Sequence, residues 1–327
     1  MPDQTLRPLG NFKPSLWGDR FCSFTLDNQL FEKYSKEVEV LKEEVNDMLV
    51  VNDAGGYKSA PEKMVLIDAL ERLGVSYLFE KEIEENLEDM FKNFEDYSHV
   101  FHDDLFMVSL HFRVFRQRGY NLSSSVFKKF TNDNGEFKET ISNDVRGMLS
   151  LYEATYLRIH GEDILEEAFR FTKAGLESLK PYLSPDLGDH VAHALYQPLH
   201  RDVSRIQARY YISFYENDPS RNEKVLRLAK IDFNRLQMLH NEELCHLFRW
   251  RKELNIMPHI PYARNRAVEC YCFGLACFFE PKYSLARLIH AMSNIVISAL
   301  DDTYDSYGTY DELKLFTNAL MRSCFDN

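Results

Sequence analysis

The sequence predicts an all-α protein with two helical domains. Long stretches repeat their apolar residues every three or four positions, which is the period of a helix with one buried face. Only 13 Gly and 11 Pro interrupt the 327 residues, and the apolar–polar alternation that marks strands is essentially absent. A chain of this length is expected to form two domains, or one domain and part of another.

The elements can be placed in order along the chain. Residues 1–25 are expected to form an extended arm anchored by Trp17 and Phe21, because Pro and Gly recur there too often for a helix. Asp27 is the expected cap of the first helix, and Pro61 opens the second. Helices are expected at 27–51, 61–74, 80–97, 103–118, 123–130, 138–159, 162–180, 186–195 and 199–215 and, after a boundary at 216–222, at 222–255, 262–279, 282–306 and 310–323.

Charge and cysteine usage narrow the classes of function. The net charge is −12, and Lys and Arg are scattered among acids without a basic stripe, which argues against a nucleic-acid partner. The six cysteines have no zinc-type spacing, and Cys270, Cys272 and Cys277 share one apolar helix, which indicates a reducing compartment. Neither a signal core nor an uninterrupted membrane-spanning run is present, so the protein is expected to be soluble and cytoplasmic.

The segment from Lys282 to Asp305 carries the first candidate site, an acidic cluster at the end of a mostly apolar helix. Asp301 and Asp305 are four residues apart, so they share a face and lie roughly 6 Å apart along the axis. Mg²⁺ prefers one or two carboxylates and completes its shell with water or phosphate. A solvated helix end is the alternative. An EF-hand is excluded, because its sixth position requires Gly and Ser306 stands there.

A pair of arginines is expected to reach the same place. The break at Pro281 should fold helices 262–279 and 282–306 into an antiparallel hairpin. Arg264 and Arg266 then lie roughly 20 to 22 Å before the turn, and Asp301 lies roughly 28 Å beyond it. The arginines are expected in the first turn of a helix opened by Pro261, where free N–H groups favour an anion. The alternative is that they only pair with neighbouring acids.

Aromatic residues are expected to line the wall between these groups: Tyr271, Phe273, Phe278 and Phe279. Aromatic residues at helical spacing usually belong to a core. Beside a diphosphate site, their faces can also stabilise a cation, by about 2 kcal/mol or more when the pocket is dry.

Four passages form a pattern that extends over almost the whole chain. They are Arg7-Pro8 with Trp17 after eight further residues, VSLHFRVFRQRGYNLSSSVFKKF at 108–130, YARNRAVECYCF at 262–273 and DDTYDSYGTYDEL at 301–313. A DDxxD motif alone is a weak signal, but an upstream Arg-x-Arg and the N-terminal arm make the combination specific. The chain therefore resembles plant terpene synthases of the cytosolic sesquiterpene type.

The resemblance implies a class I terpene synthase, a lyase that ionises and cyclises a prenyl diphosphate with loss of diphosphate. It implies Mg²⁺, with Mn²⁺ as a substitute, held by Asp301, Asp302 and Asp305, of which Asp301 and Asp305 are favoured as direct ligands. It implies that Arg264 and Arg266 bind the departing diphosphate.

The remaining implications concern the pocket, the substrate and the domains. Many relatives carry Trp where this chain has Phe273, so a π face is retained against the substrate. Farnesyl diphosphate is favoured, because the family's cytosolic members use it. The domains are expected at 1–25, an arm that caps the active site, at 26–216, an α-barrel-like helical domain, and at 217–327, the first part of the metal-binding catalytic α-domain. The expected protein is a monomer.

One element of the family pattern is missing. A second metal-binding motif, (Asn/Asp)-Asp-x-x-(Ser/Thr/Gly)-x-x-x-Glu, is not found; Asn294, Ser298 and Asp302 share its spacing but lie on the helix of the first motif. The catalytic α-bundle is therefore expected to be incomplete, and its exposed half could self-associate. The alternative function is a catalytically inactive, truncated paralogue that acts as a helical binding protein. A prenyl-chain elongating enzyme is disfavoured, because it should lack the 20–215 domain.

Overall fold

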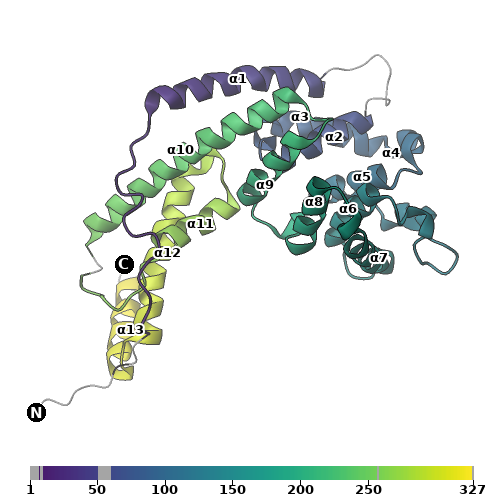
Figure 1. The fold of residues 1–327 in the computed structure, drawn as a ribbon. Coiled ribbons are helices and arrows are strands. Elements are labelled where there is room, and N and C mark those ends of the chain that lie inside the picture. Colours follow the sequence, from purple (N-terminus) through teal and green to yellow (C-terminus); the bar gives the residue numbers. More distant parts are fainter. Residues whose placement is uncertain (1–6, 8–9, 51–59, 256–257, 326–327) are drawn as a thin grey trace, which may run out of the picture. The chain divides into compact units, whose positions relative to one another are not determined.

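A computed structural model describes residue 7 and residues 10–50, 60–255 and 258–325. The described chain is helical, as predicted (Figure 1), and its only β-type pairing is an isolated bridge between Thr131 and Phe137. It divides into two compact units. One unit is Lys33–Phe233, and the other joins the N-terminal segment up to Glu32 to the chain from Asn234 onward.

The Lys33–Phe233 unit is a cluster of helices joined by short loops and 3₁₀ turns. Its α-helices are α1 (Asn28–Val50, from Lys33), α2 (Ala60–Arg72), α3 (Glu80–Lys92), α4 (Phe94–Ser98), α5 (Leu105–Gln117), α6 (Val145–Ala154), α7 (Asp163–Leu179), α8 (Pro185–Tyr196), α9 (Ser204–Asn217) and the start of α10 (Glu223–Leu254).

The core of this unit is built around α5, which buries ten of its thirteen residues. Asp104 caps α5 by accepting a hydrogen bond from the backbone N–H of Met107. Asp144 caps the neighbouring α6 in the same way, with a 2.9 Å bond from the N–H of Gly147. The two caps set where these helices begin, and the buried faces that follow pack against each other.

The second unit contains the rest of α10 with α11 (Ala267–Cys277), α12 (Ser284–Ser306) and α13 (Tyr310–Phe325). α11 and α12 form the expected hairpin around Pro281, and they pack on α10 through residues that include Phe248 and Tyr271. The N-terminal segment lies along this unit (Figure 1). As predicted, Trp17 and Phe21 anchor it: their ring centroids are 6.2 Å apart, and Phe21 lies 6.3 Å from Phe248.

A buried ion pair fastens these helices together. Arg287 of α12 is fully buried and donates to both carboxylate oxygens of Glu243 on α10, at 2.9 and 2.6 Å. Tyr271 of α11 donates to the same carboxylate at 2.6 Å. Arg287 also donates to the backbone carbonyls of Phe278 and Glu280. Helices α10, α11 and α12 and the turn that joins α11 to α12 are therefore connected at one point, where both charged side chains have partners.

Several helix boundaries differ from the sequence-based expectation. The helix expected at 80–97 is interrupted at Asn93, whose side-chain amide donates to the carbonyl of Asp89 and ends α3. The segment expected as a helix at 123–130 is a 3₁₀ helix, Ser124–Phe130, opened by the Ser123 side chain. The helices expected from 138 and 199 begin at Val145 and Ser204, after separate 3₁₀ turns.

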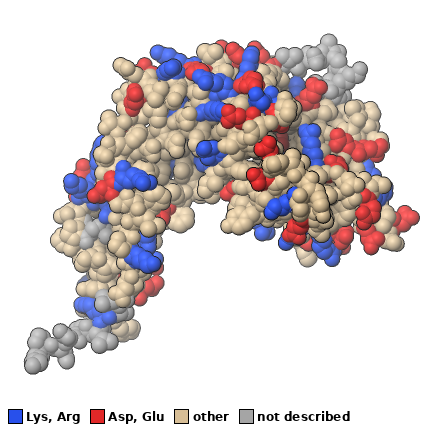
Figure 2. All heavy atoms as spheres, viewed as in Figure 1, with Lys and Arg blue, Asp and Glu red and all other residues tan. Residues whose placement is uncertain are grey.

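The surface carries mixed charge. On the face shown in Figure 2, Lys and Arg are interspersed with Asp and Glu, as expected for solvated helices. None of the helices in the described part of the chain is both long and apolar enough to cross a membrane.

Candidate active site

The acidic end of α12 presents its three aspartates in different environments. Asp301 and Asp305 are exposed, Asp301 with 55% of its side chain accessible, whereas Asp302 is 1% exposed. Thr303 donates to the carbonyl of Ala299, and Gly308 closes the helix with a 2.8 Å bond to the carbonyl of Thr303. Asp301 and Asp305 therefore face solvent together, one turn apart on the same side of the helix.

Arg264 meets two of the aspartates. Its Nη2 lies 2.8 Å from Oδ2 of Asp301 and 2.6 Å from Oδ1 of Asp302. Its backbone N–H donates to Oδ2 of Asp302 at 2.6 Å. The Nε atom of Arg264 is buried and has no hydrogen-bond partner within the described residues. The contacts to Asp301 and Asp302 thus engage one nitrogen of the guanidinium, Nη2.

The expectation that both arginines lie in the first turn of a helix is wrong. α11 begins at Ala267, so Arg264 precedes the helix and Arg266 is its N-cap residue. The N–H of Arg264 donates instead to the Asp302 carboxylate of α12, a contact between positions 38 apart.

Arg266 lies apart from the aspartates. Its nearest charged partner is Glu269, at 3.4 Å. Together with Arg264 it lines a cavity of about 380 Å³ between the 259–267 segment, the end of α10, α12 and α13. The wall of this cavity is apolar: it is formed by Ile260, Ile295, Val296, Ala299, Leu300 and Phe316 among others. Asp301 and Asp305 do not line it.

Exposed apolar side chains occur along α12. Leu285, Ile289 and Ile297 are 69%, 54% and 58% exposed. At 3.6 residues per turn, Ile297 lies about 40° from Asp301 around the helix, whereas Ile289 and Leu285 lie roughly 120° and 160° from it. Phe273, on the adjacent α11, is 63% exposed. The expectation that Tyr271 lines the cavity wall is wrong, because Tyr271 is buried and bonded to Glu243.

The N-terminal segment contributes Arg7, which belongs to the first of the four matching passages, and Phe12, which the sequence analysis did not single out. Arg7 donates to both carboxylate oxygens of Glu312, at 2.8 and 2.7 Å, and its guanidinium lies 4.4 Å from the ring centroid of Tyr307. Phe12 covers Arg264, with the guanidinium carbon 4.8 Å from its ring centroid. At the start of α13, the N–H and the hydroxyl of Thr309 both donate to Oε2 of Glu312, at 3.1 and 3.0 Å. The first bond is one half of a capping box, whose T-x-x-E pattern is visible in the sequence.

The exposed carboxylates at the end of α12 are the groups that could bind a metal ion. Within the described residues, no three His, Cys, Asp or Glu side chains are arranged to hold a metal by themselves. Asp301 and Asp305 supply two exposed carboxylates. This set fits Mg²⁺, which binds through one or two carboxylates and takes substrate phosphate and water as its other ligands.

Comparison with known proteins decides the family. The family model "Terpene synthase, N-terminal domain" matches residues 16–195, and "Terpene synthase family, metal binding domain" matches residues 252–324. The chain belongs to the terpene synthase family. This result confirms the resemblance to terpene synthases, and the aspartates and arginines described above fall within the stretch matched by the metal-binding domain of the family.

Named relatives agree with this assignment. Over 318 residues the chain is 59% identical to hedycaryol synthase of Camellia brevistyla and to a valerianol synthase of Camellia sinensis. These matches cover 97% of this chain and 56% of each relative, so the chain spans little more than half the length of the curated relatives it matches.

Solved structures agree as well. Limonene synthase with 2-fluorolinalyl diphosphate superposes with a TM-score of 0.88 at 34% identity, covering 97% of this chain and 58% of that one. Isoprene synthase of grey poplar, in complex with three Mg²⁺ ions and dimethylallyl-S-thiolodiphosphate, gives 0.82 at 34% identity, covering 90% and 55%.

Proposed function

We propose that this chain carries part of the catalytic site of a class I sesquiterpene synthase, in which farnesyl diphosphate is ionised with Mg²⁺ and cyclised with loss of diphosphate. The observation that carries the proposal is the contact between Arg264 and Asp301 at the end of the apolar face of α12. The names of the Camellia relatives and the Mg²⁺ ions of isoprene synthase support it.

The roles of the aspartates follow from their exposure. Asp301 and Asp305 would hold Mg²⁺, or Mn²⁺ in its place, because both carboxylates face solvent. Asp302 is a positioning residue, since it is buried and both of its oxygens face Arg264. The metal, when bound, would act as a Lewis acid on the diphosphate.

The arginines would receive the negative charge that develops on the leaving group. Within the part of the chain that the structure describes, the Nε donor of Arg264 has no partner, and the ion-pair partner of Arg266 is Glu269 at 3.4 Å. Charge-assisted hydrogen bonds from two guanidinium groups would stabilise the departing diphosphate more strongly than the neutral allylic ester.

The apolar face would accept the hydrocarbon part. Ile297, one turn before Asp301, offers a surface without donors or acceptors. Once covered by further protein or by the substrate itself, such a surface would keep water away from a carbocation that water would quench. The exposed ring of Phe273 offers a π face to that cation, worth about 2 kcal/mol when desolvated. The N-terminal arm, through Arg7 and Phe12, would shield the charged end.

A second function has one observation in its favour. The exposed apolar side chains of α11 and α12 have no cover within the described part of the chain, which is typical of a surface that binds another helical segment. A catalytically inactive binding protein of the same fold would use this surface instead of a substrate.

A direct activity assay distinguishes the synthase from the inactive binding protein. The chain is incubated with farnesyl diphosphate and Mg²⁺, and hydrocarbon products and released diphosphate are measured. Turnover that is lost in Asp301→Asn and kept in Asp311→Asn, a matched exposed acid on α13, supports the synthase. Appending the remaining helices of a relative tests whether turnover needs the longer chain. Absence of turnover in both forms, with binding of a helical partner, would favour the second function.

A further inference from the structure

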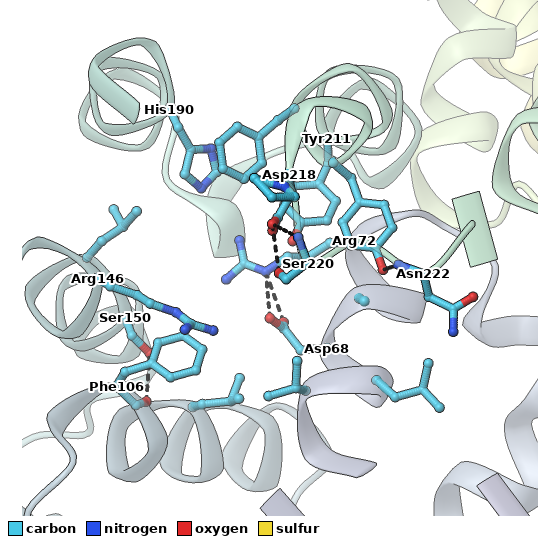
Figure 3. Close-up of a pocket in the computed structure, with 18 of the residues that line it drawn as sticks. Asp68, Arg72, Phe106, Arg146, Ser150, His190, Tyr211, Asp218, Ser220 and Asn222 are labelled. Atoms are coloured by element: carbon cyan, nitrogen blue, oxygen red, sulfur yellow. Dashed lines mark hydrogen bonds and ion pairs between the residues drawn. The ribbon is translucent and has the colours of Figure 1, made fainter. Parts of the chain in front are cut away.

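A cavity of about 920 Å³ lies in the Lys33–Phe233 unit, which contains none of the residues assigned to catalysis. The cavity is lined by residues of α2, α5, α6, α8, α9 and the loop that follows α9 (Figure 3). Its volume lies within the range of cavities that hold small organic molecules, roughly 300 to 1,000 Å³.

Two cations that line this cavity, Lys63 and Arg146, have no carboxylate partner among the described residues, and Lys63 donates to the side-chain oxygen of Asn86 at 3.2 Å. Arg146, the second residue of α6, lies with its guanidinium carbon 3.7 Å from the ring centroid of Phe106 (Figure 3). No hydrogen bond or ion pair to it is found within the described residues. A guanidinium stacked on a ring uses its face, so its N–H donors remain available in the plane. That plane can bind a carboxylate with two parallel hydrogen bonds.

The other cavity arginine is already engaged. Arg72 donates to Asp68 at 2.9 and 3.0 Å and to Glu153, and both acids are also close to Arg113. This buried network pairs its charges internally, so a ligand anion would have to displace a carboxylate to reach Arg72. Lys63 is engaged by Asn86, so Arg146, which is exposed to solvent as well as lining the cavity, is the group that would receive an anion.

The rest of the lining limits the kind of anion. Apolar side chains from four helices and the aromatic rings of α9 face the cavity; they include Leu66, Leu110, Leu149, Leu187, Tyr211 and Phe214. Glu62, Asp186 and Asp218 also line it, and they would repel a ligand with several negative charges. A ligand with one negative charge and an apolar body fits both the apolar lining and these acidic residues.

We propose that this cavity binds a monocarboxylic acid with an apolar body, its carboxylate on Arg146 and its hydrocarbon part against the leucine and aromatic wall. The site is separate from the diphosphate site and does not depend on the proposed catalysis.

The test is a calorimetric titration of the full chain with dodecanoate, below its critical micelle concentration. Arg146→Gln is expected to weaken binding about tenfold, because a charged hydrogen-bond donor is lost. Arg170→Gln, an exposed arginine of α7 outside the cavity, is the matched control and should leave binding unchanged. Leu66→Trp, which narrows the cavity, should also weaken binding, with folding checked by thermal unfolding.

Two further ligands make the assignment specific. Dodecanol lacks the charge and should bind at least about tenfold more weakly than dodecanoate. Farnesyl diphosphate should not displace dodecanoate. The proposal is overturned if dodecanoate does not bind, if dodecanol binds equally well, if Arg146→Gln has no effect, or if farnesyl diphosphate competes.

Discussion

The buried carboxylate of Asp302 accepts a 2.6 Å hydrogen bond from the backbone N–H of Arg264, 38 positions earlier in the chain. A second contact joins Oδ1 of Asp302 to the guanidinium of the same arginine. One side chain therefore fixes both the backbone and the head group of Arg264, and through it the place where Asp301 and the arginine meet. The second aspartate of the DDxxD motif acts on the arginine, while the first and third remain exposed.

Substitutions of Asp302 should lower the stability of the fold, whereas substitution of Asp301 should affect metal binding. Asp302→Ala removes the acceptor of the part-buried Arg264 N–H and one of the two carboxylates beside its guanidinium, which is expected to cost about 1–3 kcal/mol of unfolding free energy. Asp302→Asn should recover much of this loss, because its amide oxygen still accepts from the Arg264 N–H. Asp301→Ala, at an exposed position, should change stability by no more than about 0.5 kcal/mol. Urea denaturation of the three variants measures this.

Metal titration completes the comparison. Asp301→Ala should abolish calorimetrically detected binding of Mg²⁺ with diphosphate, whereas Asp302→Asn should retain it. Equal loss in both variants would contradict the positioning role of Asp302 and make it a direct ligand.

Part of this site could be predicted from the sequence, because helix geometry is regular. The rise per residue and the break at Pro281 placed Arg264 level with Asp301, and the two side chains do meet. The start of α11 was misplaced, because local propensity cannot register that the N–H of Arg264 is taken by a residue of another helix. Tyr271 was misplaced for the same reason, since its partner Glu243 lies 28 positions away.

The contacts near the N-terminal arm also include one that the sequence predicts and one that it does not. Thr309 and Glu312 have the spacing of a capping box, so the start of α13 at Tyr310 was accessible from the sequence. The second role of Glu312, as partner of Arg7, joins positions 305 apart and follows only from the fold. Local rules thus predict elements and caps, whereas long-range pairs depend on how the elements pack.

The buried pair of Arg287 and Glu243 gives a second prediction, about stability. Burial raises the pKa of Glu243, but hydrogen bonds from Arg287 and Tyr271 outweigh it and hold the pKa below its usual value. Arg287→Met removes the cation and leaves a buried carboxylate, which is expected to cost about 3–5 kcal/mol. Glu243→Leu combined with Arg287→Met should cost less than the sum of the single changes, because neither charge is then left alone.

The control for this pair is Lys314→Met, at an exposed position of α13, which should be near neutral. Guanidinium denaturation of the four variants measures the coupling. Additive losses in the double variant would mean that the two side chains do not stabilise each other.

The contact between Arg7 and Glu312 predicts a pH-dependent arm. Hydrogen bonds from Arg7 and from Thr309 lower the pKa of Glu312 from 4.5 to about 2. A lowered folded-state pKa means that the contact is fully present above pH 4.5 and is lost as the pH falls towards 2. Fluorescence of Trp17 in a Trp250→Phe background should report arm release in this window.

Glu312→Gln supplies the comparison for the arm. It should weaken docking at neutral pH and remove the transition between pH 4.5 and 2. High salt should weaken docking in the unmodified chain, because the pair is partly exposed. A Trp17 signal that is the same at all pH values in both proteins would show that Arg7 and Glu312 do not hold the arm.

The last prediction concerns His111, which is fully buried on α5. Burial lowers its pKa from 6.5 to about 4, against the opposing effect of its 2.8 Å contact with the Met107 carbonyl. Between these values the unfolded chain binds a proton that the folded chain does not, so stability should fall by about 1.4 kcal/mol for each pH unit below 6.5. His111→Phe keeps the stack on Phe101, whose centroid lies 4.4 Å away, and removes the titrating group. Urea unfolding at pH 7 and at pH 5 should therefore show a smaller difference for His111→Phe than for the unmodified chain, and an equal difference would mean that His111 is protonated in the folded state.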